Sequence, residues 1–137
     1  MRHEHRLTVR SYECDSNGHV NNAVYLNYLE AARTAFLRDA GISYREIQES
    51  GYGLMVIRIC IEYRNEARAD DPLLIVTESV RKRLTGGTFR QRVFREQPLS
   101  PAEPLLLADA EVQWVCVNRS RKPARLPPFL DLPSLTP

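Results

Sequence analysis

The residues best suited to catalysis stand together in one short polar stretch, Asp15-Ser16-Asn17-Gly18-His19-Val20-Asn21-Asn22. A carboxylate can act as a general base toward water or attack a carbonyl carbon directly. Asn17 and His19 add hydrogen-bonding groups within four residues of Asp15. Such a set suits the hydrolysis of an ester or thioester, with Asp15 as the base or as the nucleophile. The sequence alone leaves these two roles open.

The segment after this stretch predicts a long helix. Its apolar residues recur over residues 23–40 at the spacing of a buried helical face, namely Tyr25, Tyr28, Leu29, Ala32 and Phe36. Asn21 or Asn22 can cap the start of the helix, and Gly41 can end it. A helix N-terminus presents unpaired N–H groups, which stabilise an oxygen that becomes negative during acyl transfer. We therefore predict an oxyanion site formed by the backbone of Asn21, Asn22 and Ala23.

The remaining segments predict strands. Residues 6–14 alternate between apolar and polar side chains, and a short helical turn is expected over 43–49, where Ser43 and Glu46 have capping-box spacing. Four strand patterns follow at 55–63, 73–83, 88–96 and 105–118, with Gly86-Gly87 as a hairpin signal. The alternation places Met55, Ile57, Ile59, Ile61 and Tyr63 on one face of the first, and Leu106, Ala108, Ala110, Val112, Trp114 and Cys116 on one face of the last. We expect an α+β fold in which an antiparallel sheet wraps one long central helix.

Length and composition predict a single domain. The chain has 137 residues, of which 43% are apolar, and a net charge of +2 that is too small to suggest a nucleic-acid partner. No apolar run approaches the roughly 20 residues that cross a bilayer, and no signal peptide is apparent, so we expect a cytoplasmic protein without membrane contact. Residues 1–122 are expected to form the domain. Residues 123–137 are expected to form a proline-rich tail without regular structure.

Cysteine and histidine spacing gives no sign of a metal site. Cys14, Cys60 and Cys116 are far apart and lack CxxC spacing, so we expect reduced thiols, no disulfide and no metal. His3 and His5 lie near the N-terminus, where we expect them to be solvated.

The polar stretch resembles the signature of hotdog-fold thioesterases. Asp15-x-Asn17-x-His19-Val20-Asn21-Asn22, followed by Tyr25 and Glu30, is most similar to the plant acyl-carrier-protein thioesterases and the bacterial long-chain acyl-CoA thioesterases. The broader 4-hydroxybenzoyl-CoA thioesterase group shares Asp15 and Gly18 but usually lacks the His-Val-Asn-Asn part. The resemblance extends over residues 7–117. It implies the hotdog fold and an acyl-CoA thioesterase for which coenzyme A is part of the substrate, so that no cofactor is needed.

A second resemblance concerns residues 62–70, Glu-Tyr-Arg-Asn-Glu-Ala-Arg-Ala-Asp. Glu66 stands where the plant enzymes carry a catalytic glutamate, and Ala67 stands where many of them have a cysteine, so a cysteine nucleophile is excluded at that position. The resemblance implies that Asp15, Asn17, His19 and Glu66 share one site. Asn17 would orient Asp15 or the water. His19 would donate to the carbonyl oxygen or the leaving sulfur, or serve only as a structural hydrogen-bonder.

Several residues are candidates for substrate binding. Tyr25 is expected to line either the core or an acyl tunnel, and Thr88 begins a strand beside Gly87, where a ligand can approach closely. The basic run Arg81-Lys82-Arg83 can meet the phosphates of coenzyme A or the acidic surface of acyl-carrier protein, or it can simply solvate a hairpin end. Hotdog proteins pair sheets edge to edge, so the resemblance implies a homodimer or homotetramer with sites between protomers.

Competing functions are distinguishable. An acyl-carrier-protein thioesterase is the first alternative. A hotdog dehydratase would carry a different histidine and acid motif. A protein that binds acyl thioesters without cleaving them would release no thiol, and a scaffold without a ligand would show no stabilisation by acyl-CoA.

Overall fold

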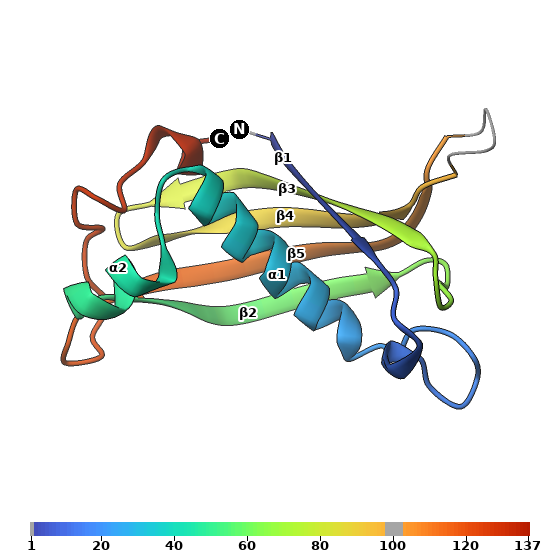
Figure 1. Cartoon of the computed structure of the whole chain (residues 1–137). Coiled ribbons are helices and arrows are strands. Elements are labelled where there is room, and N and C mark those ends of the chain that lie inside the picture. The colour runs from blue at the N-terminus through green and yellow to red at the C-terminus, as the bar shows by residue number, and fades with distance from the viewer. Residues whose placement is uncertain (1, 98–102) are drawn as a thin grey trace.

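The computed structural model describes residues 2–97 and 103–137, and its elements form one sheet that wraps one long helix (Figure 1). The strands are β1 (Arg2–Thr8), β2 (Gly53–Tyr63), β3 (Pro72–Arg83), β4 (Gly86–Arg95) and β5 (Leu105–Val117). They lie in the order β1-β3-β4-β5-β2, and every neighbouring pair is antiparallel. The predicted α+β architecture is confirmed, with β1 and β2 at the two edges.

Helix α1 (Val24–Asp39) crosses the concave face of the sheet, and α2 (Tyr44–Ser50) follows it. The predicted apolar face of α1 is confirmed, because all five residues named for it are buried. Gly41 has a positive φ just beyond the helix, where a residue without a Cβ is favoured. Ser43 and Glu46 form the predicted capping box of α2. No helix among the described residues is both long and apolar enough to span a bilayer.

The first strand differs from the prediction. It begins at Arg2 and ends at Thr8, and residues predicted to continue it instead form the 3₁₀ helix η1 (Ser11–Glu13). The turn is stabilised locally, because the Glu13 carboxylate accepts the backbone N–H of Arg10 at 2.7 Å. The expectation that His3 is solvated is wrong. Its ring packs edge-on against Phe36 and bonds the Asp39 carboxylate at 2.8 Å, because β1 lies beside α1.

Two bulges change which side chains face the helix. The register of β2 against β5 shifts between Val56 and Arg58, so Leu54 lies on the core side together with Ile59 and Ile61. The predicted face that joined Met55 to Ile59 was therefore wrong at its first residues. A second shift, between Val93 and Phe94 of β4, brings Leu107 rather than Leu106 into the core. Strict period-two counting cannot anticipate an extra residue in one strand.

The hairpin between β3 and β4 is present, but its glycines serve another purpose. Leu84 and Thr85 form the turn, and the two glycines are the first residues of β4. A Cβ on Gly86 would lie 2.2 Å from the Trp114 carbonyl oxygen, and one on Gly87 would lie 2.6 Å from the Arg81 carbonyl oxygen. Close packing against neighbouring strands therefore requires glycine at both positions.

The C-terminal segment is more ordered than its prolines suggested. Val117 pairs with Pro123 in an isolated bridge, and the chain ends near the short 3₁₀ helix η2 (Pro133–Leu135). Leu130 and Leu135 are fully buried, and the Ser79 hydroxyl donates to the Leu135 carbonyl oxygen. The leucines between the prolines supply apolar anchors. Apart from η2, residues 123–137 form no helix or strand, yet the segment packs onto the core.

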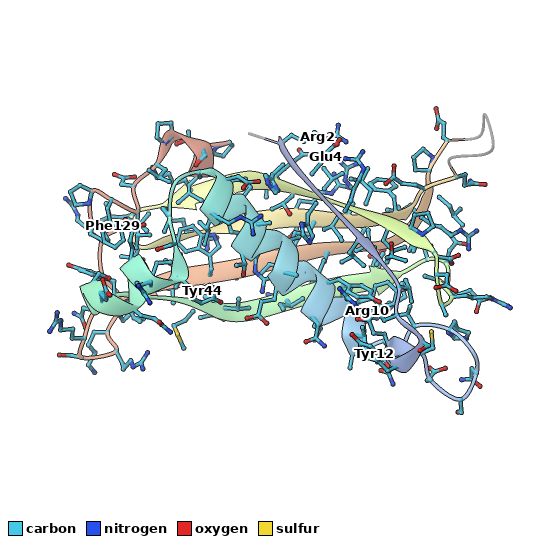
Figure 2. The ribbon with its side chains drawn as sticks, in the orientation of Figure 1. Arg2, Glu4, Arg10, Tyr12, Tyr44 and Phe129 are labelled. Atoms are coloured by element: carbon cyan, nitrogen blue, oxygen red, sulfur yellow. The ribbon has the colours of Figure 1, made fainter. Side chains whose placement is uncertain are left out.

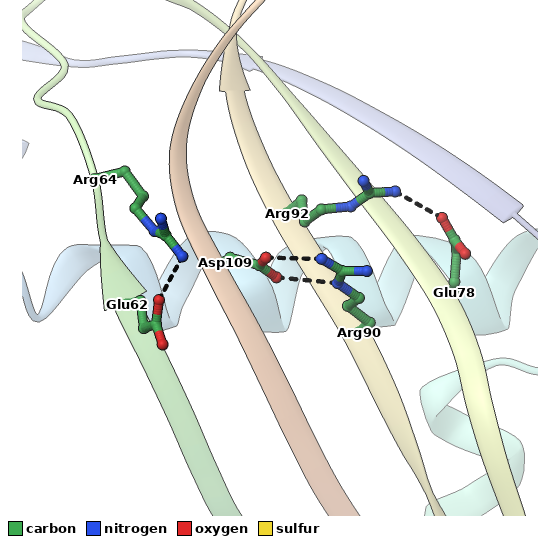
Figure 3. A network of polar contacts seen from close by, with 6 residues as sticks. All are labelled: Glu62, Arg64, Glu78, Arg90, Arg92 and Asp109. Carbon is green, nitrogen blue, oxygen red and sulfur yellow. Dashed lines mark hydrogen bonds and ion pairs between the residues drawn. The ribbon is translucent and has the colours of Figure 1, made fainter.

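The face of the sheet away from α1 carries a ladder of ion pairs (Figure 3). Arg90 of β4 binds Asp109 of β5 through two hydrogen bonds, at 3.2 and 2.9 Å. Figure 3 also shows Arg92 paired with Glu78, and Arg64 paired with Glu62. The concave face, by contrast, holds the apolar core. The polarity of the two faces thus fixes which side of the sheet receives the helix.

Candidate active site

Asp15 lies in a tight loop between η1 and α1, at the right-hand end of the molecule in Figure 1. Its backbone N–H donates to the His19 carbonyl oxygen at 2.9 Å, and its carbonyl oxygen accepts from Gly18 at 3.0 Å. One carboxylate oxygen accepts the backbone N–H of Asn17 at 2.9 Å. The second oxygen has no partner among the described residues, so the half-buried carboxylate is available to water or substrate.

Asn17 contributes to this loop through its backbone only. Its side chain is exposed and makes no hydrogen bond to Asp15 among the described residues. No contact among the described residues therefore supports the expected role of the Asn17 amide in orienting Asp15. The exposed side chain is accessible to a ligand.

His19 and Glu66 are brought together, as the resemblance implied. His19 Nε2 lies 3.1 Å from Glu66 Oε2, and both side chains are partly exposed. The contact is possible because Val20, next to His19, donates its backbone N–H to the carbonyl oxygen of Ala67 at 2.9 Å. Arg68 is farther from Glu66, at 3.9 Å. A carboxylate paired with an imidazole in this way fixes the orientation of the ring.

The start of α1 narrows the choice of oxyanion donors. The helix begins at Val24, and no side chain caps its first turn. The Asn21 N–H donates to the Glu13 carbonyl oxygen, and the Ala23 N–H donates to the Asn21 side chain at 2.9 Å. Asn21 therefore does not cap the helix as predicted, because it binds one residue before the first turn. Among the three candidates, the Asn22 N–H alone has no acceptor within the described residues.

Tyr25 belongs to the core of the protomer. It is buried, and its ring packs edge-on against Tyr28 and Tyr63. Burial raises the pKa of its phenol to about 12, which keeps the hydroxyl protonated at neutral pH. Tyr63 donates its hydroxyl to the Asn22 carbonyl oxygen at 2.8 Å and so joins the end of β2 to the start of α1.

The predicted substrate-binding residues on β3 and β4 lie at the other end of the molecule. Arg81, Lys82 and Arg83 end β3, and Thr88 pairs with Arg81. Their hairpin lies beside the start of β2, whereas Tyr63 at the end of β2 bonds Asn22 in the loop that follows Asp15. Along the 11 residues of β2 the two ends are roughly 30 Å apart. Lys82 pairs with Asp131, and Thr88 is buried.

An apolar cavity that the sequence did not reveal lies along the C-terminal half of α1. Its volume is about 280 Å³. The lining is mostly apolar and comes from α1, α2 and the loop before it, β2, β4, β5 and η2, including Leu37, Ile42, Leu54, Val56, Phe89 and Trp114. Periodicity placed Trp114 on one face of its strand, but only the arrangement of the segments in space shows that they leave a hollow. Tyr44, the first residue of α2, also lines the cavity, and Figure 2 shows it far from Arg10 and Tyr12, which lie beside the Asp15 loop.

A buried polar cluster supports the wall of this cavity. Gln91 is fully buried on β4, where its amide donates to the Leu29 carbonyl oxygen and to Thr77 Oγ1, each at 3.0 Å. Arg33, which lines the cavity, donates to Gln91 Oε1 at 2.9 Å. Burial lowers the pKa of the Arg33 guanidinium from its ordinary value. Arg33 and Gln91, which were not among the predicted site residues, thus connect α1 to the sheet.

Comparison with known proteins assigns the chain to a family. A model of the thioesterase-like superfamily matches residues 9–132. The acyl-CoA thioester hydrolase YbgC of Escherichia coli is 37% identical over 125 residues, covering 89% of each chain. A chloroplastic acyl-acyl carrier protein thioesterase of Arabidopsis thaliana is 32% identical over 128 residues, which are 91% of this chain but only 63% of the plant protein.

A solved structure shows the same architecture. The crystal structure of a probable thioesterase from Bartonella henselae superposes with a TM-score of 0.84, at 25% identity, over 93% of this chain and all of that one. The hotdog fold expected from the polar stretch is thereby confirmed. Together with the family match, this shows that the chain belongs to the thioesterase-like superfamily of hotdog-fold proteins.

Proposed function

We propose that the protein hydrolyses acyl-CoA thioesters to a free acid and coenzyme A, without a cofactor and in the cytoplasm. The observation that carries the proposal is that one carboxylate oxygen of Asp15 and the N–H of Asn22 have no hydrogen-bond partner among the described residues. Both residues belong to the loop that leads into α1. A base or nucleophile and an oxyanion donor at one helix mouth are the groups that acyl transfer requires. The name of the Escherichia coli relative supports the carrier.

The chemistry follows from these groups. The thioester carbonyl oxygen accepts the Asn22 N–H. Asp15 then either takes a proton from water as the water oxygen bonds to the carbonyl carbon, or attacks that carbon to form an anhydride, which water cleaves. In both routes the carbon–sulfur bond breaks, the thiolate leaves, and it takes up the proton that the water released. His19, which lies 3.1 Å from Glu66, would donate to the sulfur or the carbonyl oxygen.

A homodimer paired through β2 would complete the site. This edge strand exposes Val56, Ile57 and Tyr63, with 61% of Ile57 accessible. An unpaired apolar strand edge is a surface that another strand can cover. Antiparallel pairing of two β2 strands around a two-fold axis would set the Gly53 end of one protomer beside the Tyr63 end, and hence the Asp15 loop, of its partner.

This pairing would also unite features that a single chain holds apart. The cavity includes Leu54 and Val56 near the start of β2, and so would lie beside the partner's catalytic loop, where it could accept the acyl chain. Arg119 packs over Gly51 at the same end. It would stand with the predicted Arg81-Lys82-Arg83 run where a negatively charged carrier approaches.

Acyl-carrier protein is the alternative carrier, favoured by the name of the plant relative. The test is thiol release from acyl-CoA and from acyl-carrier protein loaded with the same acyl chain, over a series of chain lengths. We expect kcat/KM to be higher with coenzyme A. A higher value with acyl-carrier protein would establish the alternative, and no release from either would refute the thioesterase assignment.

A further inference from the structure

The bonds that Asp15 makes cannot by themselves fix its position relative to α1. All three run to Asn17, Gly18 and His19, within its own loop. The Val20 N–H also ties the loop to the Ala67 carbonyl oxygen at 2.9 Å, but that contact does not involve α1. A displacement of about 1 Å in a catalytic group can cost about 100-fold in rate. The proposed hydrolysis therefore requires further contacts that fix this loop relative to the start of α1.

Several such contacts converge on Glu13, two residues before Asp15. Its carbonyl oxygen accepts the Asn21 N–H at 3.0 Å, which ties the two stems of the loop together. Its carboxylate accepts the Arg10 N–H at 2.7 Å and lies 3.3 Å from the Arg10 guanidinium. The side chain is only 12% exposed. Most of the Glu13 side chain is therefore shielded from solvent.

The contact that connects this residue to the helix comes from Tyr28. Its hydroxyl donates to Glu13 Oε1 at 2.9 Å, and its ring is buried on the core face of α1. Burial and the nearby Glu13 raise the pKa of the phenol, so Tyr28 remains a donor at neutral pH. The loop that bears Asp15 is therefore bonded to the first turns of the same helix whose start presents the Asn22 N–H.

We propose that Glu13 and Tyr28 are positioning residues that hold the Asp15 carboxylate at the helix N-terminus in the geometry needed for hydrolysis. The inference rests on the proposed function. Both groups are engaged within the fold, because Tyr28 is 2% exposed and the Glu13 carboxylate bonds Tyr28 and Arg10. Both act through Asp15, so they should affect the chemical step more than substrate binding.

Tyr28→Phe is the direct test, because it removes one hydroxyl and keeps the ring that packs against Tyr25. We expect kcat for acyl-CoA hydrolysis to fall about ten- to 100-fold while KM changes less than about two-fold. Glu13→Gln keeps an acceptor oxygen for Tyr28 and should retain kcat within about three-fold, whereas Glu13→Ala should lose as much as Tyr28→Phe. Ser79→Ala, which removes another buried hydroxyl that donates to a backbone carbonyl oxygen, is the matched control and should retain the wild-type kcat.

Two results would overturn the proposal. One is wild-type kcat in Tyr28→Phe. The other is a loss of kcat in Tyr28→Phe that equals the fraction of unfolded protein at the assay temperature and disappears on cooling, which would indicate a purely structural hydroxyl. Absence of thiol release by the wild-type enzyme itself would refute the thioesterase assignment, and that failure is distinguishable from the other two.

Discussion

At the scale of single residues, the site depends on which polar groups are left without a partner. The loop satisfies the backbone of Asp15 and one of its carboxylate oxygens, and the Asn21 side chain occupies the Ala23 N–H. Among the described residues, one carboxylate oxygen of Asp15 and the Asn22 N–H are left without a hydrogen-bond partner. Unpaired groups at a helix mouth are costly to leave unsatisfied, and a reacting carbonyl can satisfy them.

Glu66 offers a test at this scale. Glu66→Gln keeps a hydrogen-bond acceptor for His19 but removes the charge. Because both side chains are partly exposed, the change should alter the free energy of unfolding by less than about 0.5 kcal/mol. If Glu66 takes part in the reaction, kcat should fall at least about ten-fold. Glu62→Gln, which breaks a similar exposed pair with Arg64, is the control.

Thiol-release kinetics and urea denaturation measure the two effects of Glu66→Gln. Unchanged kcat would identify Glu66 as a solvated charge and remove it from the predicted site.

At the scale of elements, the sequence predicted best where a pattern reflects burial over many residues. All five residues predicted for the apolar face of α1 are buried, because helical periodicity is set by the core itself. The bulges in β2 and β5 were missed. One extra residue in a strand leaves the alternating pattern of the sequence visible but turns the residues beyond it to the opposite face of the sheet. The end of β1 was missed because the Glu13 cap competes with continued strand pairing, and alternation does not detect a cap.

Elements also determine what could be predicted of the site. The Asp15 loop and the Glu66 segment are nearly 50 positions apart in sequence, and their contact came from resemblance, not from pattern. The cavity along α1 could not be predicted, because its walls come from two helices, three strands and η2, which are far apart in the sequence. Tyr28 was identified as a core residue, which it is, but its hydroxyl bond to Glu13 requires knowledge of the fold.

The ladder on the outer face of the sheet gives a prediction for strand pairing. The two hydrogen bonds from Arg90 lower the pKa of Asp109 from its ordinary value, so the folded state favours the ionised carboxylate. The resulting stabilisation is fully present above the unfolded pKa of about 3.9 and is lost as pH falls through the folded value. Asp109→Asn should therefore cost about 0.5–1 kcal/mol at pH 7, discounted for the partial exposure of both side chains.

Urea denaturation of the wild type and Asp109→Asn at several pH values measures this effect. The difference in free energy of unfolding should remain constant down to about pH 5 and shrink below about pH 4. A difference that grows as pH falls would contradict the assigned role of the Arg90 pair.

At the scale of the whole molecule, the two faces and the two edges of the sheet differ in polarity and in what covers them. The outer face is charged and internally paired, the concave face is filled by α1 and the C-terminal segment, and β1 is covered in part by its contacts with α1. The β2 edge remains apolar and exposed. The cavity and the Asp15 loop lie at opposite ends of one protomer. Pairing through β2 would bring the cavity of each protomer beside the Asp15 loop of its partner.

Ile57→Lys tests that pairing. A charge at the most exposed apolar position of β2 should prevent two edges from meeting. Light scattering should give about twice the chain mass of 15.8 kDa, or a multiple of that dimer, for the wild type, and about the chain mass for the variant, with loss of thiol release. Val80→Lys, at an exposed position of β3, should behave as the wild type. A wild-type protein that is monomeric and active would contradict the shared site.

The central claim is that the Asp15 carboxylate performs the chemistry, and the kcat of Asp15→Asn for acyl-CoA hydrolysis tests it most directly. The amide can still accept the Asn17 N–H, so the loop and the melting temperature should be preserved within about 2 °C. We predict that kcat falls at least about 1000-fold, because an amide is neither a base nor a nucleophile. A folded Asp15→Asn variant that retains kcat within about ten-fold of the wild type would contradict the account.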